Sequence, residues 1–346
     1  MKELIGSFDP GYFAFVMATG IVSIGCHLLG MEGIAGVLFL ANKAAWIIIV
    51  FLALLRLVIF PSRLAGDTGR DRGPSLFTVV PGACILGDQF VFISNDYGPA
   101  LGLWIAGLVF WVLLIYAFFT AVAADGRADH PVHAGFGGEW LIFVVGTQAV
   151  SVLGTRLAKG FADSGSAFLF ISLCMYLIGA MLYIVIIGLI FYRMFFFAMP
   201  PERLSPAYWI NMGAAAITTL SGALLLQNAG RWDFLSGLAP FLRGFTLFFW
   251  AAASWWIPLL AALNAWKYFY ARQPLSYDVK QWSMVFPLGM YTVCTYRFSS
   301  VSGLDFLAPA ASWFIYAALA AWAAVFIGML KRLLVLPERL SKTPLH

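Results

Sequence analysis

Residues 15–24 of the 346-residue chain read FVMATGIVSI, an apolar run with Gly20 near its centre. The same kind of pattern, in which apolar residues surround a glycine, recurs four times along the sequence. The later copies are TVVPGACIL around Gly82, IFVVGTQAVSV around Gly146, WINMGAAAIT around Gly213 and MVFPLGMYTV around Gly289. The glycines are 62, 64, 67 and 76 residues apart, and each interval is long enough for two membrane helices. The sequence therefore predicts five repeated helical hairpins.

The composition is that of a membrane protein. Hydrophobic residues make up 62% of the chain and charged residues only 11%, compared with about 25% charged residues in soluble domains. The mean hydropathy is +0.88. Ten apolar stretches, each long enough to cross a bilayer as a helix, predict an all-α polytopic membrane protein with a single transmembrane domain over residues 1–346. The predicted spans are 10–30, 34–60, 76–95, 98–123, 137–157, 166–197, 206–228, 239–270, 280–301 and 306–334.

The two helices of each predicted hairpin differ in character. The first carries Gly, Pro, Thr, Ser, Asn or Gln at mid-membrane, whereas the second is almost wholly aliphatic and aromatic. Small and polar residues in membrane helices favour contacts with other helices or with cavities. The pattern thus predicts a quasi-fivefold ring of hairpins, with the odd helices inside around a central pore. It leaves open whether the repeated glycines line that pore or bring the helices into contact.

The distribution of charge predicts the orientation in the membrane. Most of the 21 Lys and Arg residues lie on the side of the N-terminus, which predicts an inner-membrane protein with both termini in the cytoplasm. The N-terminal run has no convincing signal cleavage site. No nucleotide motif, catalytic triad or CxxC pair occurs, so we expect no enzyme, cofactor, metal site or nucleic-acid partner. His130 and His133 are interpreted as solvated loop residues.

Three stretches carry a resemblance to a known family. FAFVMATGIVSI (13–24), PERLSPAYWINMGAAAIT (201–218) and WSMVFPLGMYTV (282–293) resemble the tellurite-resistance/dicarboxylate transporter family. That family includes TehA-type and SLAC-type anion channels and C4-dicarboxylate, malate and sulfite carriers. The resemblance implies a homotrimer in the lipid bilayer, with one pore in each protomer for a small anion or dicarboxylate. It also implies that a phenylalanine on the ninth helix, here Phe286 of FPLG, closes the pore.

Phe286 is thus the predicted pore gate, although it could also be an ordinary packing residue. The proline after it removes a backbone hydrogen bond and bends the helix, which can direct the phenyl ring to the axis. A ring in that position would close an uncharged passage by its bulk and by dewetting. The residues predicted to shape the pore helices are Pro287, Gly289, Pro81, Gly82, Gly20, Gly146 and Gly213.

Hydroxyl and amide side chains on the odd spans are candidates to line the pore. Such weak donors can select an anion without trapping it. Each could instead bond to the carbonyl of the preceding helical turn. The candidates are Thr19, Ser23, Thr147, Gln148, Ser151, Asn211, Thr218 and Thr292.

Three ionisable residues, Asp88, Arg156 and Arg297, lie in the outer halves of odd spans and predict a charged outer mouth. The arginines could attract anions there or merely anchor helix ends at lipid headgroups. Asp88 could pair with an arginine or accept a transported proton. Two hypotheses remain: an anion channel, or a proton-coupled carrier for C4-dicarboxylate, sulfite or tellurite-type oxyanions.

Overall fold

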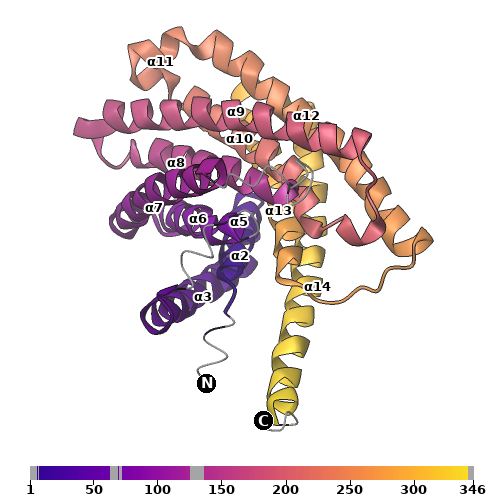
Figure 1. Ribbon diagram of the computed structural model, residues 1–346. Helices are drawn as coiled ribbons and strands as arrows, with labels where there is room; N and C mark the ends of the chain where they lie inside the picture. The colour runs from indigo at the N-terminus through magenta and orange to yellow at the C-terminus, as the bar shows by residue number, and fades with distance from the viewer. Residues whose placement is uncertain (1–5, 7, 63–68, 70–71, 125–135, 342–346) are drawn as a thin grey trace.

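A computed structural model describes residues 6, 8–62, 69, 72–124 and 136–341, and every regular element in them is helical (Figure 1). Ten of these helices are long, and short 3₁₀-, α- and π-helical turns connect them. The long helices are α2 (Phe13–Leu28), α3 (Glu32–Ile59), α6 (Val79–Ser94), α7 (Tyr97–Ala124), α8 (Ile142–Leu157), α9 (Gly165–Phe196), α10 (Ile210–Gln227), α12 (Ala239–Ala265), α13 (Trp282–Ser302) and α14 (Ala308–Ser341).

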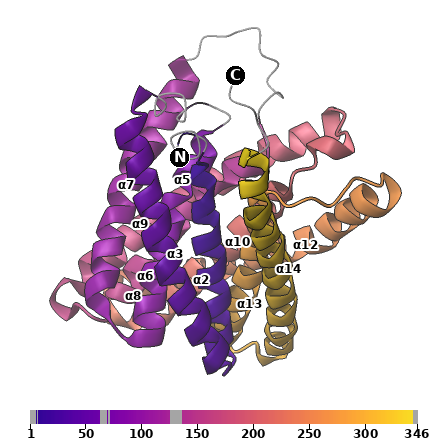
Figure 2. The ribbon, with the colours of Figure 1, turned by 90° about the horizontal axis from the view of Figure 1, so that it is seen from below.

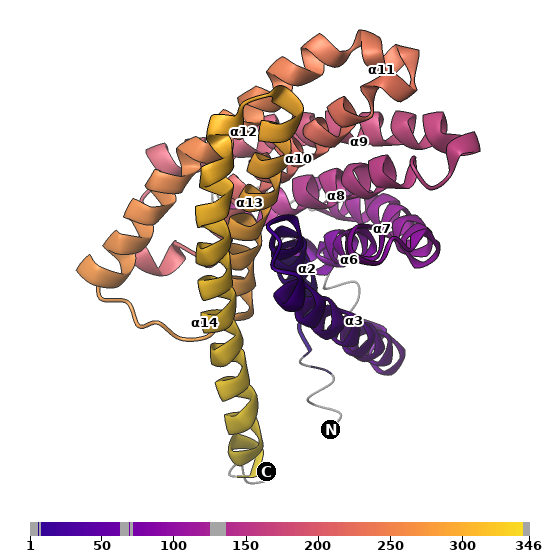
Figure 3. The same cartoon turned by 180° about the vertical axis from the view of Figure 1, so that it is seen from behind.

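Consecutive long helices pack as hairpins. The pairs in contact are α2 with α3, α6 with α7, α8 with α9, α10 with α12, and α13 with α14. Figures 2 and 3 show the last pair side by side, with α14 running along α13. The first helices of the hairpins also contact one another in sequence: α2 with α6, α6 with α8, α8 with α10, α10 with α13, and α13 with α2.

Burial separates the helices into an inner and an outer set. Every residue in the apolar stretches of α8 and α10 is buried, whereas only 22% of those in α3 and α7 are. The exposed side chains on the outer helices are largely Ile, Leu, Val and Phe, which suit contact with lipid. The inner set therefore holds the small and polar residues, and the outer set presents apolar side chains, as the sequence pattern indicates.

Nine described helices are long and apolar enough to cross a membrane, which is the composition expected of a polytopic membrane protein. The predicted span at 280–301 forms as α13, a helix of 21 residues, but it is not among the nine. Its serine, threonine, tyrosine and arginine residues make it more polar than the others. It is nevertheless enclosed by α2, α10 and α14, so neighbouring helices provide the surroundings that its polar residues require.

Three inner helices begin in the same way, with a capped 3₁₀ turn. Before α2, the side chain of Asp9 accepts a hydrogen bond of 2.8 Å from the backbone N–H of Gly11. Ser205 accepts from Ala207 before α10, and Asp278 accepts from Lys280 before α13. These caps satisfy backbone donors that have no partner within the helix, so each helix begins at a defined residue.

One close contact between inner helices joins α10 to α13. A Cβ atom at Gly213 would lie 2.7 Å from Cγ of Pro287, which is nearer than real Cβ atoms approach. Pro287 lies inside α13, where a proline removes one backbone hydrogen bond and its ring takes up space on the helix surface. Glycine at position 213 leaves room for that ring.

We expect Gly213→Ala to lower the free energy of unfolding in detergent by about 1–3 kcal/mol, because the rigid proline ring cannot turn away from the added methyl group. Thermal unfolding of the purified protein measures this change. The matched control is Gly36→Ala on α3, since a Cβ atom there meets nothing within 4 Å. Equal stability of the two variants would contradict the packing role of Gly213.

Candidate functional site

Two pockets lie at opposite ends of the inner helices. The first, which we call the inner pocket because it lies on the side predicted to be cytoplasmic, has a volume of about 40 Å³ and lies among the segments that begin these helices. It is lined by Asp9, Gly11, Ala14, Pro74, Ser75, Thr78, Glu139, Ile142, Ala207, Ile210, Val279, Lys280 and Ser283. The second, which we call the outer pocket because it lies at the opposite ends of the same helices, has a volume of about 170 Å³. It is lined by Val91, Phe92, Tyr97, Arg156, Lys159, Leu224, Gln227, Asn228 and Arg297.

The same helices contribute to both pockets. On α8, Ile142 lines the inner pocket and Arg156 lines the outer one. Fourteen residues of helix separate them, which corresponds to about 21 Å along the axis. α10 and α13 likewise reach from one pocket to the other. The two pockets therefore face opposite ends of one helical bundle, and buried side chains fill the space between them.

Phe286 lies on α13 between the two pockets. Ser283, three residues earlier, lines the inner pocket, and Arg297, eleven residues later, lines the outer one. Residues with these separations share one face of a helix. Phe286 is fully buried, and so is Met290, the next residue on that face. The phenyl ring thus belongs to the helix face that connects the pockets.

Charged groups from three helices meet at the outer pocket. Arg156 of α8 forms an ion pair with Asp88 of α6, and both residues are buried. The Arg156 guanidinium lies 4.7 Å from the ring centre of Phe92, and that of Arg297 lies 5.0 Å from the same ring. These cation–π contacts hold both guanidinium groups at the pocket. The three ionisable residues predicted to lie at one mouth are therefore close together.

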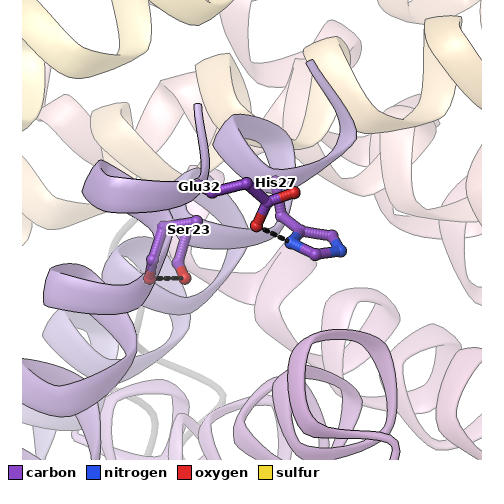
Figure 4. A network of polar contacts seen from close by, with 4 residues as sticks. Ser23, His27 and Glu32 are labelled. Carbon is purple, nitrogen blue, oxygen red and sulfur yellow. Dashed lines mark hydrogen bonds and ion pairs between the residues drawn. The ribbon is translucent and has the colours of Figure 1, made fainter. Parts of the chain in front are cut away.

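A second ionisable pair lies at the outer ends of α2 and α3. Nδ1 of His27 lies 2.7 Å from Oε2 of Glu32, and Ser23 Oγ donates a 2.8 Å hydrogen bond to the backbone carbonyl of Ala35 (Figure 4). The His27 ring also meets the edge of Phe92, with 5.1 Å between ring centres. The imidazole of His27 thus contacts Phe92, a residue that lines the outer pocket.

The predicted pore-lining polar residues are buried, and most of them form hydrogen bonds with outer helices or within their own helix. Thr19 accepts from the indole N–H of Trp322 on α14. Thr147 accepts from Trp111 on α7, and Gln148 donates to the carbonyl of Tyr176 on α9. These bonds join inner helices to outer ones.

The remaining candidates behave similarly or bond within their own helix. Ser151 donates to the carbonyl of Ser172 on α9. Thr218 and Thr292 donate to carbonyls one turn earlier, at Ala214 and Leu288. Asn211 is buried, and its amide atoms have no hydrogen-bond partner in the described part of the chain. The structure does not bring these polar groups together around Phe286.

The repeated glycines lie where helices approach closely. A Cβ atom at Gly20 would lie 2.6 Å from Ile85, and one at Gly289 would lie 3.0 Å from Ile21. At Gly146 it would clash with the ring of Phe77. Gly82 is less restricted, since the nearest atom would be 3.5 Å away. Pro81 is the third residue of α6, in the first turn, where a proline costs no helical hydrogen bond.

Lys159, Phe92 and Tyr97 complete the outer pocket and are not among the residues predicted from the sequence. The one available signal is the spacing of Asp88 and Phe92, four residues apart on α6, which places them on one helical face. The described residues contain no group of three or more His, Cys, Asp or Glu side chains that could hold a metal ion. His130 and His133 lie outside the described residues.

Comparison with known proteins identifies the family of the chain. The chain matches the family described as voltage-dependent anion channel over residues 7–330. A membrane protein from Mycobacterium tuberculosis is 38% identical over 154 residues, which cover 44% of this chain and 77% of the relative. An uncharacterized transporter from Methanocaldococcus jannaschii is 24% identical over 328 residues, which cover 91% of this chain and 93% of the relative.

A relative from Trichophyton rubrum, named a sulfite efflux pump, is 22% identical over 346 residues, covering 93% of this chain and 90% of the relative. The resemblance inferred from the three sequence stretches is confirmed by the family match. Because that match covers nearly the whole chain, this protein belongs to the voltage-dependent anion channel family.

Proposed function

We propose that this protein conducts small anions across the membrane through a pore along the axis of α2, α6, α8, α10 and α13. The observation that carries the proposal is the alignment of two pockets at opposite ends of these helices, with Phe286 buried between them. The closed series of contacts among the five helices supports a quasi-fivefold ring. In this ring Phe286 is the gate, and the pore is closed in the described conformation.

Anion selectivity is proposed to arise at the outer pocket. Arg156, Lys159 and Arg297 line it, and no carboxylate is among its described lining residues. A concentration of positive charge in a concave site attracts anions and repels cations. Between the pockets, Thr19 and Thr147 bond to outer helices, and Thr218 and Thr292 bond to carbonyls of their own helices. The weak donors on the inner helices therefore contribute less to selectivity than the cations at the pocket.

The orientation and the assembly are part of the proposal. The positive-inside distribution supports an orientation with both termini and the pocket near Asp9 and Lys280 on the cytoplasmic side. The apolar faces of α3, α7, α12 and α14 suit either lipid or neighbouring protomers of a homotrimer. The relative named a sulfite efflux pump supports a small oxyanion such as sulfite as a substrate, and the family resemblance supports C4-dicarboxylates or tellurite-type oxyanions.

A second candidate function is proton-coupled transport of the same anions. It is favoured by Asp88, a buried carboxylate in contact with the outer cations. Its ion pair with Arg156 fits a structural role, in which the carboxylate neutralises one guanidinium. It also fits coupling, in which a proton replaces the guanidinium as the partner of the carboxylate.

We expect Phe286→Ala to raise anion conductance in planar bilayers or liposomes by about tenfold or more, since tenfold corresponds to removing a barrier of about 1.4 kcal/mol. The substitution widens the constriction without adding charge. Phe51→Ala on the exposed face of α3 is the control, because that ring is 62% exposed and lines neither pocket. Conductance that stays at the wild-type level in Phe286→Ala, at equal reconstitution, would remove the gate assignment.

We expect Asp88→Asn to lower stability by about 3–5 kcal/mol, because it leaves the buried Arg156 without its counter-ion. It should reduce downhill anion flux and flux driven by a pH gradient to the same extent. Thermal unfolding and a liposome flux assay measure the two effects. Selective loss of the pH-driven flux, with downhill flux intact, would instead favour the proton-coupled carrier.

We expect Arg297→Gln to reduce conductance more at low salt than at high salt, because ions screen its field over about 8–10 Å at physiological ionic strength. Anion-over-cation preference should fall only modestly, since Arg156 and Lys159 remain. Single-channel currents and reversal potentials in a salt gradient measure this. Arg243→Gln, at an exposed position near the start of α12, is the matched control. An equal effect of both variants would assign Arg297 a headgroup-anchoring role.

A further inference from the structure

The outer pocket contains more positive charge than the surrounding protein neutralises. Arg156, Lys159 and Arg297 all line it. Asp88 forms an ion pair with Arg156, which accounts for one of these three charges. Glu32 is paired with His27, whose ring contacts Phe92. Asp88 also attracts Arg297, so one negative charge faces three positive charges, and a surplus of two positive charges remains among these described residues.

The two arginines also have donors that nothing satisfies. Nη2 of Arg156 and Nε of Arg297 are buried and have no hydrogen-bond partner in the part of the chain that is described. The Arg156 side chain is only 10% exposed. A buried guanidinium N–H without an acceptor is costly, so an acceptor from outside the protein would be bound favourably. Contact with Phe92 holds both groups in place.

The pKa of Lys159 also indicates an excess of positive charge at the pocket. Partial burial lowers the pKa of its ammonium group, and the neighbouring charges of Arg156, Arg231 and Arg297 lower this pKa further. The shift means that the protein disfavours another positive charge at this place. An anion in the pocket would reverse that effect, because it attracts all of these cations at once.

We propose that the outer pocket is a binding site for a doubly charged oxyanion, held by Arg297, Lys159 and the free Nη2 of Arg156. The surplus of two positive charges matches an anion of charge −2 and exceeds what a halide neutralises. Guanidinium groups donate two parallel hydrogen bonds to the oxygens of such anions, and an ammonium group adds a point charge. The inference rests on the proposed anion transport, as the place where the substrate binds before the constriction, but binding itself does not require conduction.

Thermal unfolding of the purified protein in detergent tests the site, with sulfate as the probe. Methanesulfonate has a similar shape and a single charge, and chloride is the halide reference, all at equal ionic strength. We expect sulfate to raise the melting temperature at concentrations where the other two anions have little effect. Lys159→Gln and Arg297→Gln should each weaken the apparent affinity for sulfate by about tenfold or more, as expected for the loss of a charge-assisted contact.

Sulfate also stabilises folded proteins in general by exclusion from their surface, and that effect acts on every variant alike. Arg243→Gln, which removes an exposed charge outside the pocket, should keep the full response. Lys159→Arg, which retains the charge, should restore most of the response lost in Lys159→Gln. Lys159 is exposed at the rim, so its replacement does not endanger folding.

Three results would overturn the inference: equal stabilisation by methanesulfonate and sulfate, an unchanged sulfate response in both pocket variants, or an equal loss in Arg243→Gln. The outcome is separate from that of the proposed function. A wild-type protein that conducts anions in liposomes but shows no specific sulfate binding would refute this site and leave the channel proposal intact. Specific sulfate binding without anion conductance would support the site and count against the channel.

Discussion

The packing of the Pro287 ring against Gly213 constrains how α13, the helix that carries Phe286, lies against α10. A proline inside a membrane helix removes a hydrogen bond, and neighbouring helices are one means of satisfying the backbone group that this frees. α13 has such neighbours, because α2, α10 and α14 enclose it. The same contact fixes α13 against α10 at the level of Phe286, the residue immediately before the proline. The position of the phenyl ring between the pockets thus follows from a packing constraint.

The hydrogen bonds of the inner helices have a consequence for ion passage. Thr19, Thr147 and Gln148 satisfy their polar groups on outer helices, and so they join the two layers. Polar groups in lipid need such partners, and the outer helices supply them through indole N–H groups and backbone carbonyls. In the proposed pore, the hydroxyl groups of Thr19 and Thr147 would therefore be less available to a passing ion. Charge that favours an anion is concentrated at the outer pocket.

Much of the architecture could be predicted from the sequence, because the glycine-centred repeat and the contrast between adjacent spans depend only on composition and order. The sequence did not allow us to predict whether each polar side chain points to the axis of the bundle or to an outer helix. α8 and α10 are buried on all sides, so a hydrophobic face does not reveal which residues point to the axis and which to an outer helix. The outer mouth was predicted in part: Asp88, Arg156 and Arg297 meet there. Lys159 and Phe92 were missed, because their role depends on three helices that are distant in sequence.

The pair formed by Asp88 and Arg156 also constrains how a carrier mechanism could work. A proton on Asp88 would cancel its charge and leave Arg156 without a counter-ion in a buried position. An anion in the outer pocket would restore the balance of charge, since Arg156 lines that pocket. Proton and anion would then bind more tightly together than either does alone, and by linkage each would increase the affinity for the other to the same extent. A channel and a proton-coupled carrier can therefore share this geometry, and they differ in whether Asp88 exchanges its proton during each passage.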